Sequence, residues 1–443
     1  MWVKITKDKD KIYFYLISLG CAKNLIDSEK ITEHLIKAGY ALTEDISEAS
    51  LIIINTCGFI KDAKRESIDV ILNTLQEKPP DSKIVVYGCL VQRYQKELKE
   101  LIPEVDLFLP IISYKEFTEK IMTNFPISSA SKIKKQKRIL FTPPSYTYIK
   151  ISEGCGNFCS YCSIPLIRGP LKSYSINEIV SEVKKALDRG VYEINLIAQD
   201  ITAYGVDIYQ KPSLNLLIKS ILSIKREFWL RLLYLYPARI STELIKLIKS
   251  DSRIVKYVDI PIQHVNNRIL RLMNRHYTKE ILRKKIELLR EKIPSIAIRT
   301  SIITGFPTET EKDFQELIEF IKEVKFENLG VFEYSPEEGT KALFLKPRVP
   351  SYVREKRRKV LMNIQKELVK EKNKSFKGKT FPCLVELPVD KYGGLWTGRI
   401  FSQAPDVDGR VYFTNHNTGE WRKVVNVRIN DFKDYDLIGE CIE

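Results

Sequence analysis

The strongest constraint on the fold is a pattern that occurs three times near the N-terminus: an apolar, β-branched run that leads into a cysteine. The runs are "KIYFYLISLGC", "ASLIIINTCG" and "SKIVVYGC", and their cysteines are Cys21, Cys57 and Cys89. Helix-like stretches such as 27–38 and 61–75 lie between them. Strands that alternate with helices predict a parallel sheet, whose strand carboxyl ends share one edge. We therefore expect the fold to bring the three cysteines together, rather than to bury them as unrelated core thiols.

A second α/β segment follows a linker, which is marked by the basic tract 132–138 and by Pro143-Pro144. Helical patterns at 176–188 and 279–292 separate further strand-like runs. These runs are "YTYIKISEGC", "EINLIAQD", "FWLRLLYLYP", "YVDIPIQH", "IAIRTSIITGFP" and "NLGVFEYSPEEGT". The pattern predicts a β/α barrel or most of one, with its chemistry on the loops that follow the strands.

The composition changes after a charged, helix-prone connector at 352–374, on whose basic face we expect Arg357, Arg358 and Lys359. Short alternating segments with Gly and Asp turns then predict a small OB-like β-barrel. From residue 377 onward nine Lys and Arg stand against ten Asp and Glu, although the whole chain carries a formal net charge of +16. A near-neutral barrel suits a basic protein surface better than RNA, because phosphate contacts dominate nucleic-acid affinity.

We therefore predict three domains, at 11–125, 141–372 and 373–443. The overall basic charge favours a polyanionic partner such as RNA or a ribosome, although a Lys- and Ile-rich proteome would give the same value. We expect no membrane partner, because no apolar run approaches the roughly 20 residues that span a bilayer. Eight cysteines without a secretion signal predict reduced thiols in the cytoplasm, available to bind metal.

A metal site is predicted by "SEGCGNFCSYCSIP", where Cys155, Cys159 and Cys162 have C-x3-C-x2-C spacing on the loop after the first barrel strand. Thiolates suit zinc and iron–sulfur clusters. A closed zinc site needs four ligands, and His264 is the nearest candidate for a fourth in a barrel loop. The spacing also differs from the C-x2-C-x2-C run of electron-carrying ferredoxins. A 4Fe–4S cluster on three thiolates leaves one iron open, which favours a catalytic cluster over a zinc knuckle or a plain electron carrier.

The motif resembles the signature of the radical S-adenosylmethionine (SAM) superfamily, in which SAM binds the open iron. The domain order resembles that of the methylthiotransferase family: an α/β domain with three cysteines, a radical SAM barrel and a terminal TRAM module. That family replaces C–H by C–S–CH3. The resemblance implies two 4Fe–4S clusters and SAM as cofactors, with one cluster on each cysteine triad.

Several motifs resemble the RimO-type branch of this family, which modifies an aspartate β-carbon of small-subunit ribosomal protein S-twelve. They are "SLGCAKNLIDSE", "NTCGFI", "AQDITAYGVD" and "YSPEEGT". The branch that modifies adenosine in tRNA remains the alternative. One departure is "LKSYSINEI", which has Tyr174 and Ser175 where the family often shows Arg-Pro. The implied partners are S-twelve or the assembled small subunit, and an electron donor such as flavodoxin or ferredoxin.

The resemblance also implies SAM contacts, each with a structural alternative. Tyr161 would pack on adenine or serve loop packing, and Gln199 with Asp200 would face the amino end of SAM, unless Asp200 caps a helix. Gly305 would support the adenine or serve its turn alone. Arg299 would pair with a carboxylate of SAM or substrate, or form a salt bridge within the barrel.

Three other residues are assigned no catalytic role from the sequence. His264 either lines the pocket or is a hydrogen-bonded structural histidine. Cys383 and Cys441 have no partners at ligand spacing, so we interpret both as ordinary residues of the terminal barrel.

Overall fold

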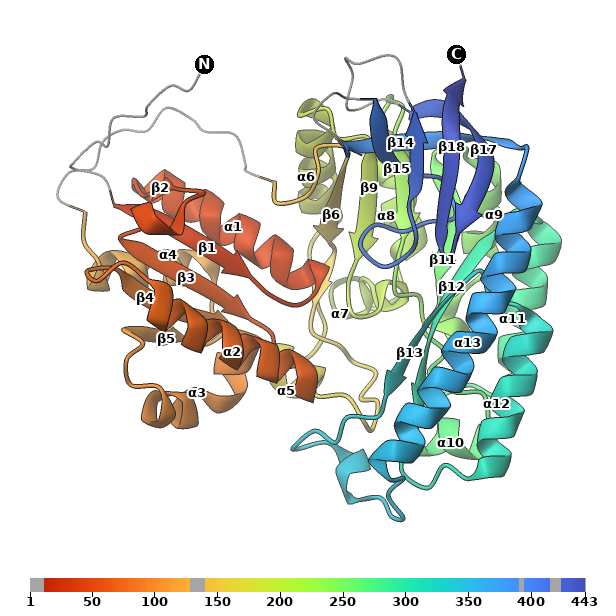
Figure 1. Cartoon of the computed structure of the whole chain (residues 1–443), viewed down its shortest axis with the longest axis horizontal. Coiled ribbons are helices and arrows are strands. Elements are labelled where there is room, and N and C mark those ends of the chain that lie inside the picture. Colours follow the sequence, from red (N-terminus) through yellow and green to blue (C-terminus); the bar gives the residue numbers. More distant parts are fainter. Residues whose placement is uncertain (1–11, 128–139, 390–393, 415–423, 443) are drawn as a thin grey trace. The chain divides into compact units, whose positions relative to one another are not determined.

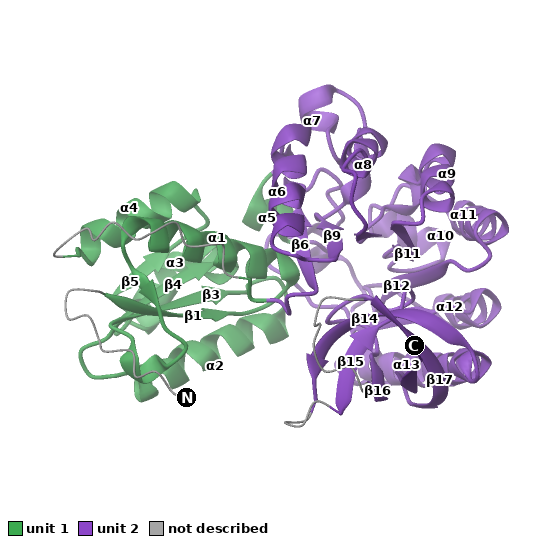
Figure 2. Cartoon of the chain, turned by 90° about the horizontal axis from the view of Figure 1, so that it is seen from above, with its two compact units in different colours: residues 1–141, 163–169 green, residues 142–162, 170–443 purple. Residues whose placement is uncertain are grey.

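The chain divides into two compact units in a computed structural model (Figure 2). Unit 1 comprises residues 1–141 and 163–169, and unit 2 comprises 142–162 and 170–443. The structure describes residues 12–127, 140–389, 394–414 and 424–442, so the basic tract at 132–138 lies outside it. The segment 163–169, directly after Cys162, belongs to unit 1, although the cysteine loop before it belongs to unit 2. The three predicted domain boundaries stay a prediction.

Unit 1 is built on a five-stranded parallel sheet in the order β2-β1-β3-β4-β5 (Figure 1). The strands are β1 (Tyr13–Ser18), β2 (Ala41–Leu42), β3 (Leu51–Thr56), β4 (Lys83–Gly88) and β5 (Leu107–Leu109). The helices are α1 (Ala22–Ala38), the 3-10 turn η1 (Ile46–Glu48), α2 (Lys61–Glu77), α3 (Cys89–Leu101), α4 (Tyr114–Asn124) and α5 (Ile164–Arg168). The predicted parallel α/β arrangement of the N-terminal segment is confirmed.

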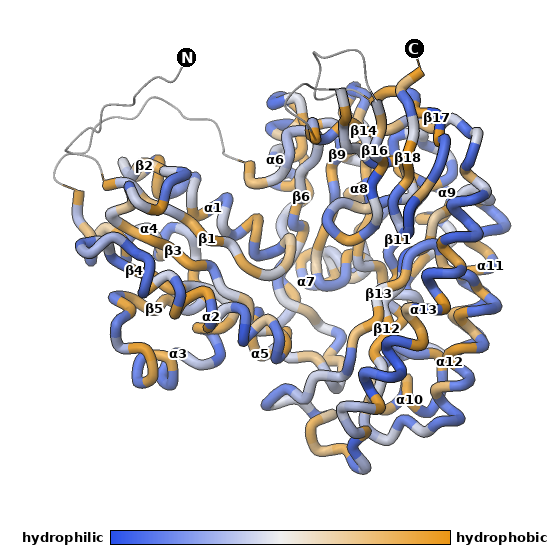
Figure 3. The backbone as a smooth tube through the Cα atoms, in the orientation of Figure 1, coloured by the Kyte–Doolittle hydropathy of each residue, from blue (hydrophilic) through white to orange (hydrophobic). Residues whose placement is uncertain are grey.

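Helices cover both faces of this sheet, which explains the continuous apolar runs (Figure 3). Leu35 of α1 and Phe117 of α4 pack against Ile53 on one face. Ile71 of α2 packs on the other face, against Ile52. Because successive strand residues point to opposite faces, every residue of β3 is buried.

The first helix differs from the prediction, because α1 begins at Ala22 and not at residue 27. Its first turns carry the polar residues Lys23, Asn24 and Asp27, all of them buried. A helix that buries polar side chains has no apolar stripe to mark its start.

Unit 2 contains a six-stranded parallel sheet in the order β13-β12-β11-β10-β9-β6, so it forms most of a β/α barrel. The strands are β6 (Tyr146–Lys150), β9 (Glu193–Ile197), β10 (Trp229–Leu232), β11 (Ile254–Asp259), β12 (Ala297–Thr304) and β13 (Asn328–Glu333). The main helices are α6 (Ile176–Asp188), α8 (Leu214–Leu222), α9 (Thr242–Ser250), α11 (Lys279–Lys292) and α12 (Glu311–Val324). All six predicted strands are present, and the predicted helices 176–188 and 279–292 coincide with α6 and α11.

Short elements complete the sheet's loops. They are the ribbon of β7 (Ser152–Glu153) and β8 (Lys172–Ser173), the helices α7 (Val206–Tyr209) and α10 (Asn267–Leu272), and the 3-10 turns η2 (Ile201–Ala203), η3 (Pro237–Arg239) and η4 (Lys341–Phe344). Most of them lie on loops that follow strand carboxyl ends.

The connector forms α13 (Ser351–Phe376), which contacts β12 and β13 of the sheet and β17 of the terminal barrel. The sequence predicted Arg357 on the basic face of this helix, and this prediction is wrong. Arg357 is buried and paired with Glu309. The remaining strands close into the expected small barrel in the order β14-β15-β16-β18-β17. They are β14 (Thr380–Pro388), β15 (Leu395–Arg399), β16 (Val411–Thr414), β17 (Val424–Lys433) and β18 (Asp436–Ile442).

A buried ion network joins the sheet to this closed barrel. Glu193 Oε1 accepts a 2.6 Å hydrogen bond from Arg231 Nε, and the same carboxylate pairs with Arg399 of β15. Arg399 Nε also donates to Glu386 Oε1 at 2.5 Å. All four side chains are buried, so removing one partner would leave uncompensated charge in a dry environment. In the described part of the chain, no helix is long and apolar enough to cross a membrane.

We predict that Glu193→Gln costs about 3–5 kcal/mol of unfolding free energy, because it leaves two buried guanidinium groups short of negative charge. Urea-induced unfolding measures this loss. Asp188→Asn is the matched control: it breaks a 2.8 Å pair with Arg226 in which both side chains are exposed, and it should cost less than about 1 kcal/mol. Equal, small losses for both variants would contradict the structural role given to the network.

Candidate active site

The first cysteine triad lies in unit 2, on a tight loop that follows β6 and β7. Cys155, Cys159 and Cys162 are all partly exposed. Within the loop, the Asn157 amide donates to Cys155 Sγ at 3.5 Å, and the Cys162 amide donates to the Cys159 carbonyl at 3.0 Å. Phe158 adopts a left-handed backbone, with φ of 48°. The turn therefore offers three thiols from eight consecutive residues.

Asp200 fixes this loop to the ends of the neighbouring strands. One carboxylate oxygen accepts hydrogen bonds from Asn157 Nδ2 at 2.8 Å and from Arg239 Nη1 at 2.5 Å. The other accepts from the amide and hydroxyl of Thr202, so Asp200 caps η2. The structure thus shows the capping role that the sequence left open. Gln199 lies beside it, half-buried, after β9.

The segment around α10 supports the loop from another side. Ser160 donates through its amide to the Met273 carbonyl at 3.0 Å and through its hydroxyl to the Leu272 carbonyl at 2.7 Å. Tyr161 packs against an apolar cluster, with its ring edge-to-face to Phe306 at 6.4 Å between centroids. Tyr161 therefore has the loop-packing contacts of the structural alternative, on a ring that stays partly exposed.

Arg275 supplies a buried positive charge to this triad. Its Nη1 lies 3.7 Å from Cys159 Sγ, and its Nε donates to the Tyr277 hydroxyl at 2.7 Å. Its Nη2 donates to the Pro261 carbonyl at 2.6 Å, and its guanidinium stacks 4.4 Å from the centre of the Tyr236 ring. No local sequence pattern marks this residue, because Cys159, Pro261 and Tyr236 lie on other loops.

Gly305 lies in a turn that only glycine fits well. Its φ is 69°, and an added Cβ would lie 2.0 Å from Arg354 Cγ. Its amide donates to Glu309 Oε2 at 2.9 Å, while Glu309 Oε1 accepts from Arg357 Nη1 at 2.6 Å. Burial raises the pKa of Glu309 to about 7, against the lowering effect of Arg357.

His264 belongs to the same buried network and does not line a pocket. Its side chain is fully buried, with Nε2 3.7 Å from Glu309 Oε2 and Nδ1 accepting from the Asn266 amide at 3.0 Å. Burial lowers the pKa of His264 to about 4, so it is neutral near pH 7. His264 is therefore a buried, hydrogen-bonded structural histidine.

Arg299 is engaged elsewhere. Its Nη1 pairs with Asp408 Oδ1 of the closed barrel at 2.6 Å, and its Nε lies 3.8 Å from Asp259 Oδ1. The salt-bridge alternative describes this residue, because its guanidinium holds the closed barrel against the sheet. We therefore leave Arg299 out of the proposed SAM site.

The second triad lies in unit 1, where β1, β3 and β4 are neighbours and each leads into one cysteine. Cys21 precedes α1, Cys57 follows β3 and Cys89 begins α3. Burial, with smaller contributions from the charges of Cys89 and Cys21, raises the pKa of Cys57 to about 12. The three thiols therefore lie within electrostatic reach of one another, as the parallel sheet predicts.

Close packing before Cys89 depends on Gly88. Its φ is 108°, and an added Cβ would lie 2.5 Å from Asn55 Oδ1 of β3. Asn24 of α1 donates to the Thr56 carbonyl at 3.1 Å, and its Oδ1 lies 3.6 Å from Cys89 Sγ. Polar side chains of α1 and β3 thus lie beside Gly88 and Cys89.

Arg168 of α5 contacts the second triad as well. Its Nη2 lies 3.3 Å from Cys89 Sγ and 2.7 Å from Asn24 Oδ1, and its Nη1 donates to Asp27 Oδ2 at 2.7 Å. Sequence reasoning missed this residue. The available signal was an arginine six residues after Cys162 in the run "CSIPLIRG".

The other two cysteines of the chain lie in the closed barrel. Cys383 is in the closed barrel's core, and Cys441 packs against that core, as expected for ordinary residues.

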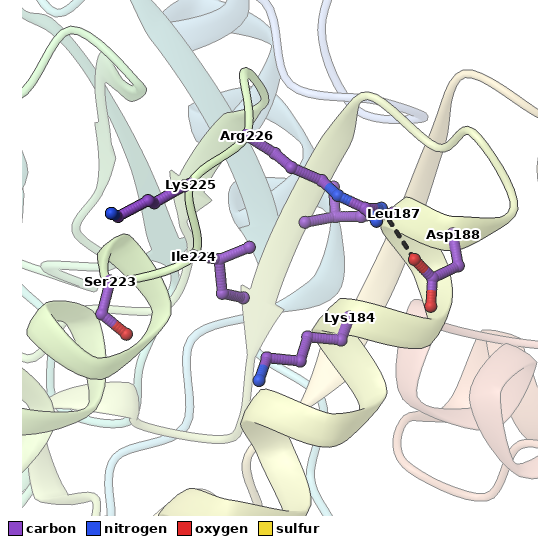
Figure 4. A pocket seen from close by; sticks show the side chains of 7 residues that line it. All are labelled: Lys184, Leu187, Asp188, Ser223, Ile224, Lys225 and Arg226. Atoms are coloured by element: carbon purple, nitrogen blue, oxygen red, sulfur yellow. Dashed lines mark ion pairs between the residues drawn. The ribbon is translucent and has the colours of Figure 1, made fainter.

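A pocket of about 410 Å³ lies between α6 and the loop before β10 (Figure 4). Its lining comprises Lys184, Leu187, Asp188, Ser223, Ile224, Lys225 and Arg226, none of which is a predicted site residue.

Comparison with known proteins decides the family. Three family models match: an uncharacterized protein family, UPF0004, over residues 13–110, the radical SAM superfamily over 149–321 and the TRAM domain over 378–442. A relative named ribosomal protein uS12 methylthiotransferase RimO, from Acetivibrio thermocellus, is 44% identical, and the match covers 96% of this chain and 98% of the relative. The chain belongs to the RimO family of methylthiotransferases.

Other RimO relatives match over a similar extent. The proteins of that name from Clostridium acetobutylicum and Aquifex aeolicus are 43% and 42% identical, and each match covers 97% of this chain. They cover 98% and 97% of the respective relatives. Among solved structures, a radical SAM methyltransferase, TsrM, from Kitasatospora setae gives a TM-score of 0.55 at 12% identity over 72% of each chain. At that identity the likeness shows a shared fold alone.

The donor set of each triad is three cysteine thiols, and thiolates are the soft ligands that iron–sulfur clusters take. Burial also raises the pKa of Cys155 to about 11, so this thiol needs a cationic partner to be ionised at neutral pH.

We predict that Cys57→Ala and Cys159→Ala each remove one cluster's worth of iron from the anaerobically reconstituted protein, because each triad then has two thiolates. Iron and sulfide assays per chain measure this. Cys441→Ala is the control and should retain full iron, since this thiol lies against the closed barrel's core. Full iron content in either triad variant would refute that triad as a ligand set.

Proposed function

We propose that this chain replaces a C–H bond at the β-carbon of an aspartate in ribosomal protein S-twelve (uS12) by C–S–CH3. The observation that carries the proposal is the near-full-length identity of 44% to a relative named for uS12 methylthiotransfer. The two cysteine triads support it, since each lies where a parallel sheet gathers its strand ends. The tRNA alternative has lost support, because the relatives compared above are named for a ribosomal protein.

Two 4Fe–4S clusters and SAM are the cofactors of this proposal. Cys155, Cys159 and Cys162 would hold the cluster whose open iron binds SAM, and the second triad would hold a cluster involved in sulfur delivery. When bound, these groups supply the one-electron chemistry that generates a carbon-centred radical from SAM and the sulfur that is transferred.

The residues around the first triad fix its geometry and limit its access to water. Asp200 ties the loop to Asn157 and Arg239, so the positions of the thiols do not depend on the loop alone. Tyr161 and Phe306 contribute apolar surface beside it, and such shielding protects a reactive radical from side reactions. In this proposal Tyr161, Gln199 and Gly305 stay candidate SAM contacts, whereas Asp200 acts by positioning.

The substrate and partners follow from the same chemistry. The substrate carbon loses hydrogen and gains SCH3, so the peptide gains the mass of SCH2. The methyl group would come from a second SAM, and the electron from a donor such as flavodoxin or ferredoxin. The near-neutral terminal barrel suits a basic ribosomal-protein surface, on free uS12 or on the assembled subunit in the cytoplasm.

A reconstituted assay tests this function. With SAM, a reductant and purified uS12, the native chain should release 5′-deoxyadenosine and add SCH2 to one aspartate peptide, as measured by mass spectrometry. Transfer RNA from a strain without methylthio nucleosides is the parallel substrate and should remain unmodified. Methylthiolation of the tRNA in place of the peptide would overturn the proposed substrate.

Variants of the two triads separate the two proposed cluster roles. Cys159→Ala should abolish 5′-deoxyadenosine release, because SAM then lacks its cluster. Cys57→Ala should still release 5′-deoxyadenosine but leave the peptide unmodified, because only sulfur delivery is lost. Release of 5′-deoxyadenosine at the native rate by Cys159→Ala would contradict the assignment of the first triad.

A further inference from the structure

Arg168 is the last residue of α5, the short helix that follows the cysteine loop. It lies six residues after Cys162, yet its segment 163–169 belongs to unit 1, where its guanidinium reaches the second triad. Its side chain is 5% exposed. A buried guanidinium stays charged at every physiological pH, so its partners decide whether the site tolerates it.

The guanidinium contacts Cys89, Asn24 and Asp27. Nη2 lies 3.3 Å from Cys89 Sγ and 2.7 Å from Asn24 Oδ1, while Nη1 donates to Asp27 Oδ2 at 2.7 Å. Asp27 is also buried, and its other oxygen accepts from the Tyr114 hydroxyl at 2.8 Å. The carboxylate thus balances the charge of Arg168 and fixes the direction in which its second nitrogen faces the sulfur.

The placement of Arg168 favours negative charge on Cys89. Its Nη2 is a charged donor 3.3 Å from Cys89 Sγ, and the Arg168 side chain is buried, so water screens this charge little. Hydrogen bonds and charges next to ligand sulfurs tune the reduction potentials of iron–sulfur clusters. A cation at this distance stabilises the reduced, more negative state of a cluster bound to the same sulfur.

We propose that Arg168 is a positioning residue that orients Cys89 and raises the reduction potential of the cluster on Cys21, Cys57 and Cys89. This inference rests on the cluster assignment in the proposed function and does not depend on the identity of the substrate. The short helix directly after the first triad in the sequence therefore supplies the cation that tunes the second cluster.

The chain offers a matched control at the other triad. Arg275 places Nη1 3.7 Å from Cys159 Sγ and is likewise buried. Its partners Cys159, Pro261, Tyr236 and Tyr277 all belong to unit 2. Arg275→Gln therefore removes a buried arginine from the other triad and keeps the contacts of Arg168.

The test measures the midpoint potential of the second cluster by itself. In a full-length background with Cys155, Cys159 and Cys162 replaced by Ala, only the second triad can bind iron, and an EPR-monitored redox titration reports its potential. We expect Arg168→Gln to shift this potential to a more negative value, because the cation is lost. Asp27→Asn should shift it to a more positive value, because the charge of Arg168 is no longer balanced.

The opposite signs distinguish a charge effect from general loosening of the site. Arg168→Lys keeps a cation and should lie closer to the background than Arg168→Gln, while Arg275→Gln should match the background. An unchanged potential in a fully loaded Arg168→Gln protein, or shifts of the same sign in Arg168→Gln and Asp27→Asn, would overturn the proposal.

Iron content separates failure of this proposal from failure of the cluster assignment. If the background protein binds no iron, the assignment of the second triad is wrong. If only Arg168→Gln loses iron, the potentials of Asp27→Asn and Arg168→Lys test the proposal. A positive shift in Asp27→Asn together with a background-like potential in Arg168→Lys supports the role of Arg168, and an unchanged Asp27→Asn potential overturns it.

Discussion

The parallel direction of the strands is the constraint on which the rest of this structure depends. In each unit the carboxyl ends of neighbouring strands meet at one edge, and a cysteine triad lies on the residues that follow them. The two triads reach that edge differently. The second triad takes one cysteine from each of three strand ends, whereas the first takes all three from a single loop, which Asp200 and Arg275 hold in place.

Buried charge is the second principle of this molecule. Arg168 and Arg275 each direct a nitrogen at a triad sulfur, and each donates another nitrogen to an oxygen atom. Glu193 and Arg399 form a buried ion pair that fixes the terminal barrel to the sheet. Because desolvated ions are costly without partners, these networks specify geometry more strictly than apolar packing does.

Local patterns in the sequence predicted two parallel α/β segments, a small terminal barrel and the strand ends that lead into the six cysteines. They predicted less where a side chain's role depends on a distant partner. The guanidinium of Arg299 suggested a partner for a carboxylate of SAM or substrate. It pairs instead with Asp408, more than a hundred residues away in the sequence. Arg168 was missed because its partner Asp27 lies 141 residues earlier in the chain. The early start of α1 was hidden for a related reason, since Asn24 and Asp27 are buried polar residues and leave no apolar stripe.

The central claim is that this enzyme modifies the ribosomal protein uS12. The most direct test of this substrate is made in the cell. Peptide mass spectrometry of small-subunit ribosomal proteins is compared between a parent strain and a strain that lacks this gene. The account predicts that one uS12 aspartate peptide is lighter by the mass of SCH2 in the deletion strain and that the methylthio nucleosides of its tRNA are unchanged. Identical uS12 peptides, together with loss of a methylthio group from tRNA, would contradict the account.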